Sequence, residues 1–185
     1  GIFAIGSLVV LLLGMSLMDF MEPKKKTEHF DNGSMEVTYI KGVKQGEATI
    51  SYSSGDREIV TFQGDVIQGD ATYYFKDETR MDLTYVNGKR QGKAALFFSN
   101  GDREEFTFVD NQKQGEGIYY FSDRAHEKYT YVDGKRQGKA TISDINGDRM
   151  EFTYVDSKRE GKGLYFFASG DREEFTYIAG MRQGE

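Results

Sequence analysis

The segment Thr130–Lys139 has the sequence TYVDGKRQGK, and Thr84–Lys93 has the nearly identical sequence TYVNGKRQGK. The glycine that closes this phrase recurs every 23 residues, at Gly46, Gly69, Gly92, Gly115, Gly138, Gly161 and Gly184. A threonine followed by an aromatic residue keeps the same interval and begins at Thr38, Thr61, Thr84, Thr107, Thr130, Thr153 and Thr176. Columns that stay in phase seven times without an insertion indicate a repeat array.

Each repeat combines two turn sites with two short strand-like segments. A step such as Asn100–Gly101 suits a tight turn because glycine accepts positive φ. The second turn surrounds a glycine such as Gly134, and the segments between turns, such as 93–99 and 102–109, are rich in aromatic and β-branched residues. One repeat is therefore one β-hairpin. We predict a mainly β fold, an elongated single-layer antiparallel sheet of about seven stacked hairpins and about 14 strands.

The composition supports this fold class and excludes several functions. The 185 residues include 22 Gly, 12 Tyr and 14 Phe but one Pro, which is typical of many short strands joined by tight turns. The net charge of −6 argues against nucleic-acid binding, because phosphate contacts need concentrated Lys and Arg. The absence of Cys from the sequence excludes disulfides, thiol catalysis and thiolate metal sites.

The N-terminal segment differs from the repeats, because residues 1–18, GIFAIGSLVVLLLGMSLM, contain no charged residue. As a helix they would span ~27 Å, close to the ~30 Å hydrocarbon core of a bilayer. We predict a transmembrane helix over residues 1–21, a basic juxtamembrane linker over 22–27 and a repeat array over 28–185. The linker contains Lys24, Lys25 and Lys26. By the positive-inside rule, these lysines place the array on the cytoplasmic or equivalent inner side of the membrane.

A buried core helix and a cleaved signal peptide are the alternative interpretations of this apolar segment. A core helix normally has a polar face, and here only Ser7 and Ser16 are polar. A signal peptide normally has a basic region before its apolar residues and small residues at a cleavage site, and neither is evident. The pattern favours the transmembrane interpretation.

The motif aromatic–x2–Gly–x3–Gly–x–Gly or Ala resembles the MORN repeat (membrane occupation and recognition nexus). It is carried by Tyr131–Ala140 and, with Ser157 in place of the first Gly, by Tyr154–Gly163. The resemblance extends over about residues 28–185. Two columns depart from the family: two and four residues before the aromatic, where it usually has Gly and Tyr, this chain has an apolar residue and Glu or Met. The resemblance implies an elongated scaffold of hairpins that tethers membranes, organises assemblies or dimerises. It also implies a link to phospholipid headgroups, and it brings no catalytic residue.

Two sets of repeated residues are candidates for partner binding. An aromatic column precedes the Asn–Gly turns, and an acid replaces the aromatic in one copy; its members are Tyr52, Phe75, Phe98, Phe121, Asp144 and Phe167. We expect this column to contact a partner protein, with the acid either breaking the local packing or docking a basic side chain. The second set is a possible anionic-lipid edge formed by Lys89, Arg90, Lys135, Arg136, Lys158 and Arg159. The alternative is that these cations form a solvated edge that prevents aggregation.

The sequence offers no catalytic or metal-binding constellation. Its two histidines, His29 and His126, stand apart from each other and from any metal-ligand spacing. The segment Asp144–Asp148 alternates acids and an amide like a calcium loop, but its glycine comes too early for an EF-hand, and an Asn–Gly turn explains it better. We therefore expect no enzyme activity, no cofactor and no metal.

These observations predict a membrane-anchored, non-catalytic scaffold that is a structural subunit of a larger membrane protein complex and binds its partners through the hairpin sheet. One alternative is a membrane tether that binds anionic lipid through the Lys–Arg edge. Another is a periplasmic or secreted binding module whose apolar segment is a signal sequence. Self-association is a further expectation, since an uncovered sheet edge at the C-terminal repeat can pair with another strand.

Overall fold

The computed structural model of the chain describes residues 22–183, which form one open antiparallel sheet of 17 strands and contain no helix. The strands are β1 (Lys24–Phe30), β2 (Gly33–Ile40), β3 (Val43–Tyr52), β4 (Arg57–Gln63), β5 (Val66–Ile67), β6 (Gly69–Tyr74), β7 (Arg80–Val86), β8 (Lys89–Arg90), β9 (Gly92–Phe97), β10 (Arg103–Val109), β11 (Gln112–Tyr120), β12 (His126–Val132), β13 (Lys135–Ser143), β14 (Arg149–Val155), β15 (Lys158–Phe166), β16 (Arg172–Ile178) and β17 (Met181–Gln183). The mainly β, antiparallel fold predicted from the repeats is confirmed.

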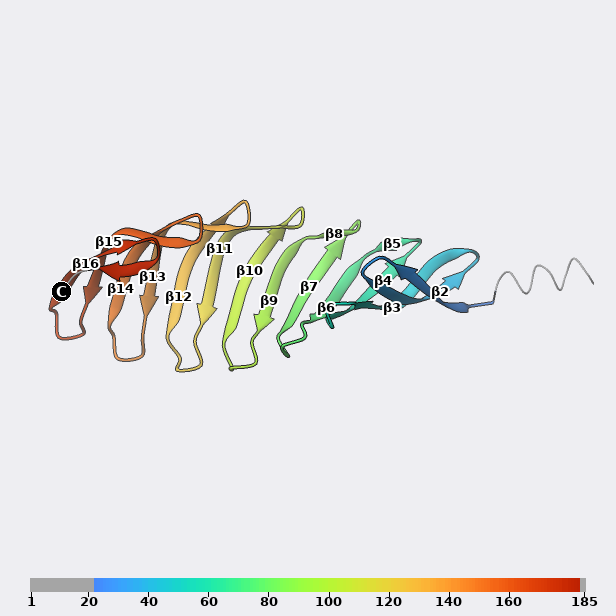
Figure 1. The fold of residues 1–185 in the computed structure, drawn as a ribbon, viewed down its shortest axis with the longest axis horizontal. Coiled ribbons are helices and arrows are strands. Elements are labelled where there is room, and N and C mark those ends of the chain that lie inside the picture. Colours follow the sequence, from blue (N-terminus) through green and yellow to red (C-terminus); the bar gives the residue numbers. More distant parts are fainter. Residues whose placement is uncertain (1–21, 184–185) are drawn as a thin grey trace, which may run out of the picture.

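Consecutive hairpins lie side by side, so that the strands cross a long ribbon (Figure 1). Seven hairpins are built from β2/β3, β4/β5–β6, β7/β8–β9, β10/β11, β12/β13, β14/β15 and β16/β17. The turns within these hairpins, which contain the GKRQG phrase, follow one long edge of the ribbon, and the Asn–Gly turns between hairpins follow the other (Figure 1). The repeated sequence thus gives two separate turn edges.

The predicted transmembrane helix lies outside the described residues. Among residues 22–183, no helix has the length and apolar character needed to cross a membrane. The segment predicted as a linker is part of the sheet from Lys24 onward, because β1 pairs with β2 along its whole length. Its lysines suit an edge strand, which charged side chains protect from pairing with other chains. Lys26 Nζ also lies 4.7 Å from the ring centroid of Tyr39 on β2.

The glycine that closes each GKRQG phrase marks a β-bulge. Between β10 and β11 the register shifts between Glu105, which lies opposite Ile118, and Thr107, which lies opposite Gln114. Gly115, within the shifted segment, has a φ of 75°, a conformation that other residues adopt only with strain. The bulge bends the hairpin at this point. The requirement for positive φ explains why this column contains glycine in every repeat.

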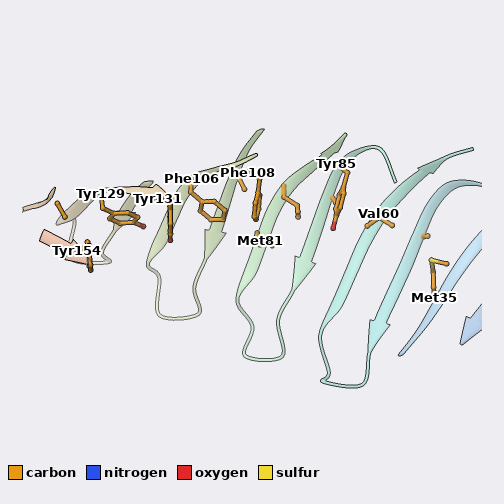
Figure 2. Close-up of a cluster of buried hydrophobic side chains, with 14 of the residues drawn as sticks. Met35, Val60, Met81, Tyr85, Phe106, Phe108, Tyr129, Tyr131 and Tyr154 are labelled. Carbon is orange, nitrogen blue, oxygen red and sulfur yellow. The ribbon is translucent and has the colours of Figure 1, made fainter. Parts of the chain in front are cut away.

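The two faces of the sheet differ, since strand residues alternate between them. One face, which we call the packed face, carries Glu104, Phe106 and Phe108 of β10 and the equivalent residues of the other repeats. Its core is the row of side chains in Figure 2. Its members include Met35, Val37, Val60, Phe62, Met81, Leu83, Tyr85, Phe106, Phe108, Tyr129, Tyr131, Phe152, Tyr154, Phe175 and Tyr177. The opposite face, which we call the open face, carries residues such as Thr107 and Val109.

Basic side chains from the bulged hairpins cover the rings of the packed face. Lys113 Nζ lies 3.8 Å from the ring centroid of Phe106. The Arg136 guanidinium lies 4.0 Å from the ring of Tyr129, and Arg159 repeats this contact 4.4 Å from Phe152 one repeat later. These cation–π contacts remove the aromatic rings from water in a sheet that has only one layer.

Candidate binding surfaces

The predicted aromatic column lies at the Asn–Gly turn edge. Phe98, for example, closes its turn with two backbone hydrogen bonds, from its own N–H to the Asp102 carbonyl (3.0 Å) and from the Gly101 N–H to its carbonyl (3.0 Å). Tyrosines from β6 and β11 fill the space between column members. The ring centroid of Tyr119 lies 5.5 Å from that of Phe98 and 4.8 Å from that of Phe121. Tyr73 similarly lies between Tyr52 and Phe75, and Tyr165 contacts Phe167. The column is therefore partly buried, except for the exposed Phe167, and it links neighbouring turns.

Asp144, the acid in this column, uses its carboxylate within its own turn. Its Oδ1 accepts hydrogen bonds from the backbone N–H of Asn146 (2.8 Å) and of Asp148 (3.0 Å). The Asp148 carboxylate in turn accepts from the Tyr165 hydroxyl (2.8 Å) and the Ala168 N–H (2.8 Å) of the next repeat. The acid thus caps a turn, which matches the Asn–Gly turn interpretation of this segment. Among residues 22–183, no group of three His, Cys, Asp or Glu side chains is placed to hold a metal ion.

The structure separates the Lys and the Arg of each predicted lipid-edge pair, because neighbouring strand residues point to opposite faces. The lysines lie on the open face, where Lys89 pairs with Asp110 and Lys135 with Asp156, each at 3.0 Å. Lys158 occupies the equivalent exposed position. The arginines of the same pairs, Arg90, Arg136 and Arg159, turn to the packed face and contact tyrosine hydroxyls and rings. The six cations therefore do not form one stripe.

The packed face contains a network of buried carboxylates that was not predicted from the sequence. Glu104 is its centre, with only 4% of its side chain exposed. Its Oε1 accepts from the hydroxyls of Tyr131 (2.6 Å) and Tyr129, and it contacts Arg136 Nη2 at 3.2 Å. Its Oε2 accepts from Lys113 Nζ at 3.0 Å. Both oxygens of this buried carboxylate accept hydrogen bonds, and no buried side-chain polar atom among the described residues lacks a partner.

The contacts of Glu104 recur at fixed sequence offsets. A glutamate, the tyrosine 27 residues later and the arginine 32 residues later form the sets Glu104–Tyr131–Arg136, Glu127–Tyr154–Arg159 and Glu58–Tyr85–Arg90. Where the first residue is Met, the second is Phe in two of three cases, as in Met35–Phe62–Ile67 and Met81–Phe108–Lys113; in the third, Met150 Sδ lies 3.8 Å from the Tyr177 hydroxyl. Each set joins one repeat to the next. The chain therefore contains polar and apolar inter-repeat junctions.

The polar junctions make stability depend on pH. Burial raises the pKa of the Glu104 carboxyl, but the Lys113 ammonium and the hydroxyls of Tyr129 and Tyr131 outweigh it and hold the pKa below its usual value of 4.5. Burial and the nearby Glu104 carboxylate raise the pKa of Tyr131 to about 12. A lowered carboxyl pKa stabilises the fold above about pH 4.5, and a raised tyrosine pKa stabilises it below about pH 10.

We expect the urea midpoint of the full chain to fall as the pH drops below about 4.5 and again as it rises from about 10 towards 12. The first loss follows protonation of Glu104 on unfolding, and the second follows ionisation of Tyr131 on unfolding. Urea titrations across this range, followed by circular dichroism, test the expectation. In Glu104→Gln the urea midpoint should fall less as the pH drops below about 4.5. A fall equal to that of the wild type contradicts the assignment.

A second feature that sequence reasoning missed is a row of exposed apolar residues on the open face. The last residue of β7, β10, β12, β14 and β16 is β-branched and apolar in each case, and it follows the Tyr or Phe of the packed face. The row consists of Val86, Val109, Val132, Val155 and Ile178, whose exposed fractions run from 42% to 58%. We call it the valine row. It follows the GKRQG turn edge over five consecutive hairpins, opposite the aromatic column.

A groove lies on the open face across β6, β7, β9, β10 and β11, with a volume of about 1190 Å³. Its lining combines small, hydroxyl and apolar side chains with charged ones, and Val109 of the valine row borders it. The groove and the valine row both lie on the open face, and the sheet geometry requires neither of them.

A family model for the MORN repeat matches residues 38–57, 84–103, 107–125, 130–149 and 153–172. It thus matches five of the seven copies counted from the 23-residue interval. Among solved structures, the chain is similar to the SAS-4 (dCPAP) TCP domain of Drosophila melanogaster, solved in complex with a proline-rich motif of Ana2 (dSTIL). The identity is 15%, the TM-score is 0.43, and the match covers 83% of this chain and 90% of that one. None of the curated proteins compared with the chain matches it.

The five family matches cover more than half of the chain and coincide with in-phase hairpins of the sheet. The motif glycines also have a structural role, since the closing glycine is the residue at each bulge that adopts positive φ. Motif, interval and hairpin structure agree, and the chain belongs to the MORN-repeat family.

Proposed function

We propose that this MORN-repeat chain is a non-catalytic scaffold that binds partner proteins on the open face of its sheet. In the finer form of the proposal, its N-terminal segment anchors it in a membrane, with the repeats on the inner side, and it is a structural subunit of a larger membrane complex. MORN repeats are protein-interaction and scaffold modules, which supports the general function. The valine row is the observation that carries the choice of surface.

The valine row has no evident role in holding the sheet together. The residues paired with Val86, Val109 and Val132 across each hairpin are Lys89, Gln112 and Lys135, which are polar and offer no shared apolar contact. Single exposed valines are ordinary, but five in register place one apolar side chain per hairpin on the open face, with residues such as Lys89, Gln112 and Lys135 on the strands between them. A regular row of exposed apolar side chains of this kind suits a surface that another protein covers.

The lipid-tether alternative now concerns the lysines rather than the full set of six cations. Lys89, Lys135 and Lys158 lie beside the valine row, and acids accompany the first two. Retention of the full chain, kept in mild detergent, on beads coated with anionic or neutral lipid tests this hypothesis at low salt, with and without Lys→Gln changes at these lysines. Equal retention of all samples contradicts it.

If the valine row binds partners, changing it should reduce the recovery of co-purified partner subunits. Affinity purification of the full chain in mild detergent should recover stoichiometric partner subunits. The triple variant Val109→Thr, Val132→Thr and Val155→Thr should reduce their recovery by about tenfold, because hydroxyls replace the apolar contacts of an interface centre. Threonine keeps the β-branched shape, so the strands are preserved. Protein quantification of the purified complex provides the measurement.

The matched control is the double variant Val43→Thr and Val66→Thr. These valines are exposed to a similar degree, 38% and 41%, but lie outside the valine row. We expect the control to retain its partners. A chain that purifies without partners, or a control that loses them as fully as the triple variant, contradicts the proposal.

A further inference from the structure

Four carboxylates and two cations line the groove on the open face. The carboxylates belong to Asp70, Asp82, Glu105 and Glu116, and the cations to Arg80 and Lys93. The lining charge is therefore −2. The remaining lining includes Thr72, Ala95, Thr107 and Ile118, whose short or apolar side chains form a floor without further charge.

The cations near the groove do not neutralise all of these acids. Arg80 pairs with Asp82 at 3.1 Å and also stacks on Phe97, with 4.5 Å to the ring centroid. Arg103, outside the lining, pairs with Glu105 at 3.2 Å. Asp70 accepts only a hydroxyl hydrogen bond, from Thr84 at 3.0 Å, and forms no ion pair within residues 22–183. Asp70 and Glu116 are therefore available to a cationic ligand.

The fold does not require acids at these two positions. Asp70 and Glu116 belong to a column of the 23-residue repeat whose other members in the sequence are Glu47, Lys93, Lys139, Lys162 and Glu185. Lysine thus occupies the same place in three hairpins of the same sheet. Within the groove this column places Lys93 of β9 between Asp70 of β6 and Glu116 of β11 in strand order, so its acids outnumber its lysine by one.

The dimensions of the groove suit a peptide segment. Four steps of about 4.8 Å separate β6 from β11, so the groove extends over about 19 Å, the length of about six residues of extended chain. Its volume of about 1190 Å³ exceeds that of a typical small-molecule site. Acids beside an apolar floor and the valine row complement a ligand that carries both basic and apolar side chains.

We propose that the groove binds a segment of a partner protein that combines Lys or Arg with small apolar residues. The proposal deepens the scaffold function and rests on it. Binding desolvates the apolar floor, while Asp70 and Glu116 pair with the basic side chains and fix the register of the segment. Because these ion pairs are open to solvent, the affinity falls as salt increases.

Fluorescence anisotropy on the full chain in mild detergent tests the proposal. The probe is a labelled peptide that alternates Lys and Val over about eight residues, compared with one that alternates Glu and Val. We expect the Lys–Val peptide to bind at about 50 mM salt and to dissociate at about 500 mM, and the Glu–Val peptide not to bind. Equal binding of the two peptides, or no binding of either, overturns the proposal.

Charge-reversal variants locate the site. The double variant Asp70→Lys and Glu116→Lys should weaken binding of the Lys–Val peptide by about tenfold or more. Glu47→Lys is the matched control, because it belongs to the same column but lies outside the groove, and it should change the affinity by less than about twofold. Lysine at this column is already compatible with the sheet, so all variants should keep the wild-type melting temperature. Equal losses in control and groove variants overturn the assignment.

The two proposals fail separately. If valine-row variants lose co-purified partners but the groove variant binds the Lys–Val peptide normally, the scaffold stands and the groove assignment is wrong. If the groove variant alone loses the peptide while the partners stay bound to the triple valine variant, the groove is supported and the valine row is not the main interface.

Discussion

Glu104→Ala should lower the free energy of unfolding by about 3–5 kcal/mol. The change leaves the Lys113 ammonium and the Arg136 guanidinium without their carboxylate in a site where only 4% of the glutamate is exposed. Two tyrosine hydroxyls lose their acceptor as well. Removing one partner of a buried ion pair lowers stability by more than the intact pair contributes, because the remaining charges stay buried without compensation.

Urea denaturation of the full chain followed by circular dichroism measures this loss. Glu105→Ala is the matched control, since the neighbouring residue points to the open face and its ion pair with Arg103 is exposed on both sides. That control should change stability by about 0.5 kcal/mol or less. A loss below about 1 kcal/mol for Glu104→Ala contradicts the network, because removal of a buried partner should exceed that value.

The hairpin architecture was predictable because its signals are local. A bulge that needs positive φ selects glycine, as at Gly115, and the same need recurs once per repeat. Two-residue turns impose a similar need on Asp110 and Asn111, which have φ values of 49° and 71°. These backbone requirements leave a periodic record in the sequence, so the interval of 23 predicts hairpins in register.

The contacts between repeats give a weaker signal in the sequence than the turns do. The Glu-or-Met column was visible as a departure from the MORN motif, and alternation alone places Glu104 on the same face as Phe106 and Phe108. A charged residue is nevertheless expected to be exposed unless its partners are known. Here the partner Arg136 comes from a hairpin 32 residues away. The signal that was available is the change from Glu, Tyr and Arg in the Glu58 set to Met, Phe and Ile in the Met35 set, the one junction that changes in all three columns.

The binding surfaces were hard to assign for a different reason. The Lys–Arg pairs were interpreted together because both residues are basic. Neighbouring strand residues point to opposite faces, however, so Lys135 and Arg136 lie on different faces of the sheet. The valine row follows the same 23-residue interval, but a single valine at a strand end is not informative. Only the register of five such residues on an uncovered face gives the row a meaning. Faces therefore had to be assigned before charge or hydrophobicity was interpreted.

Met35→Glu should destabilise the first junction by about 3 kcal/mol, and two further changes should recover about half of that loss. Met35 is buried against Phe62 and Ile67, which offer no hydroxyl or guanidinium. The nearest cation in the equivalent position, Lys44, already pairs with Glu28 at 2.7 Å. A glutamate introduced alone is therefore left without sufficient partners.

The triple variant Met35→Glu, Phe62→Tyr and Ile67→Arg copies the composition of Glu58–Tyr85–Arg90 into the first junction. If the offsets of 27 and 32 residues define a complete junction, the new hydroxyl donates to the new carboxylate, as Tyr85 does to Glu58, and the new guanidinium donates to that hydroxyl, as Arg90 does to Tyr85. The control is the double variant Phe62→Tyr and Ile67→Arg, which should be destabilised because its polar groups face Met35. Urea denaturation of the four proteins gives the coupling energy, expected at about 1–3 kcal/mol. Purely additive losses would show that the buried triads do not act as units.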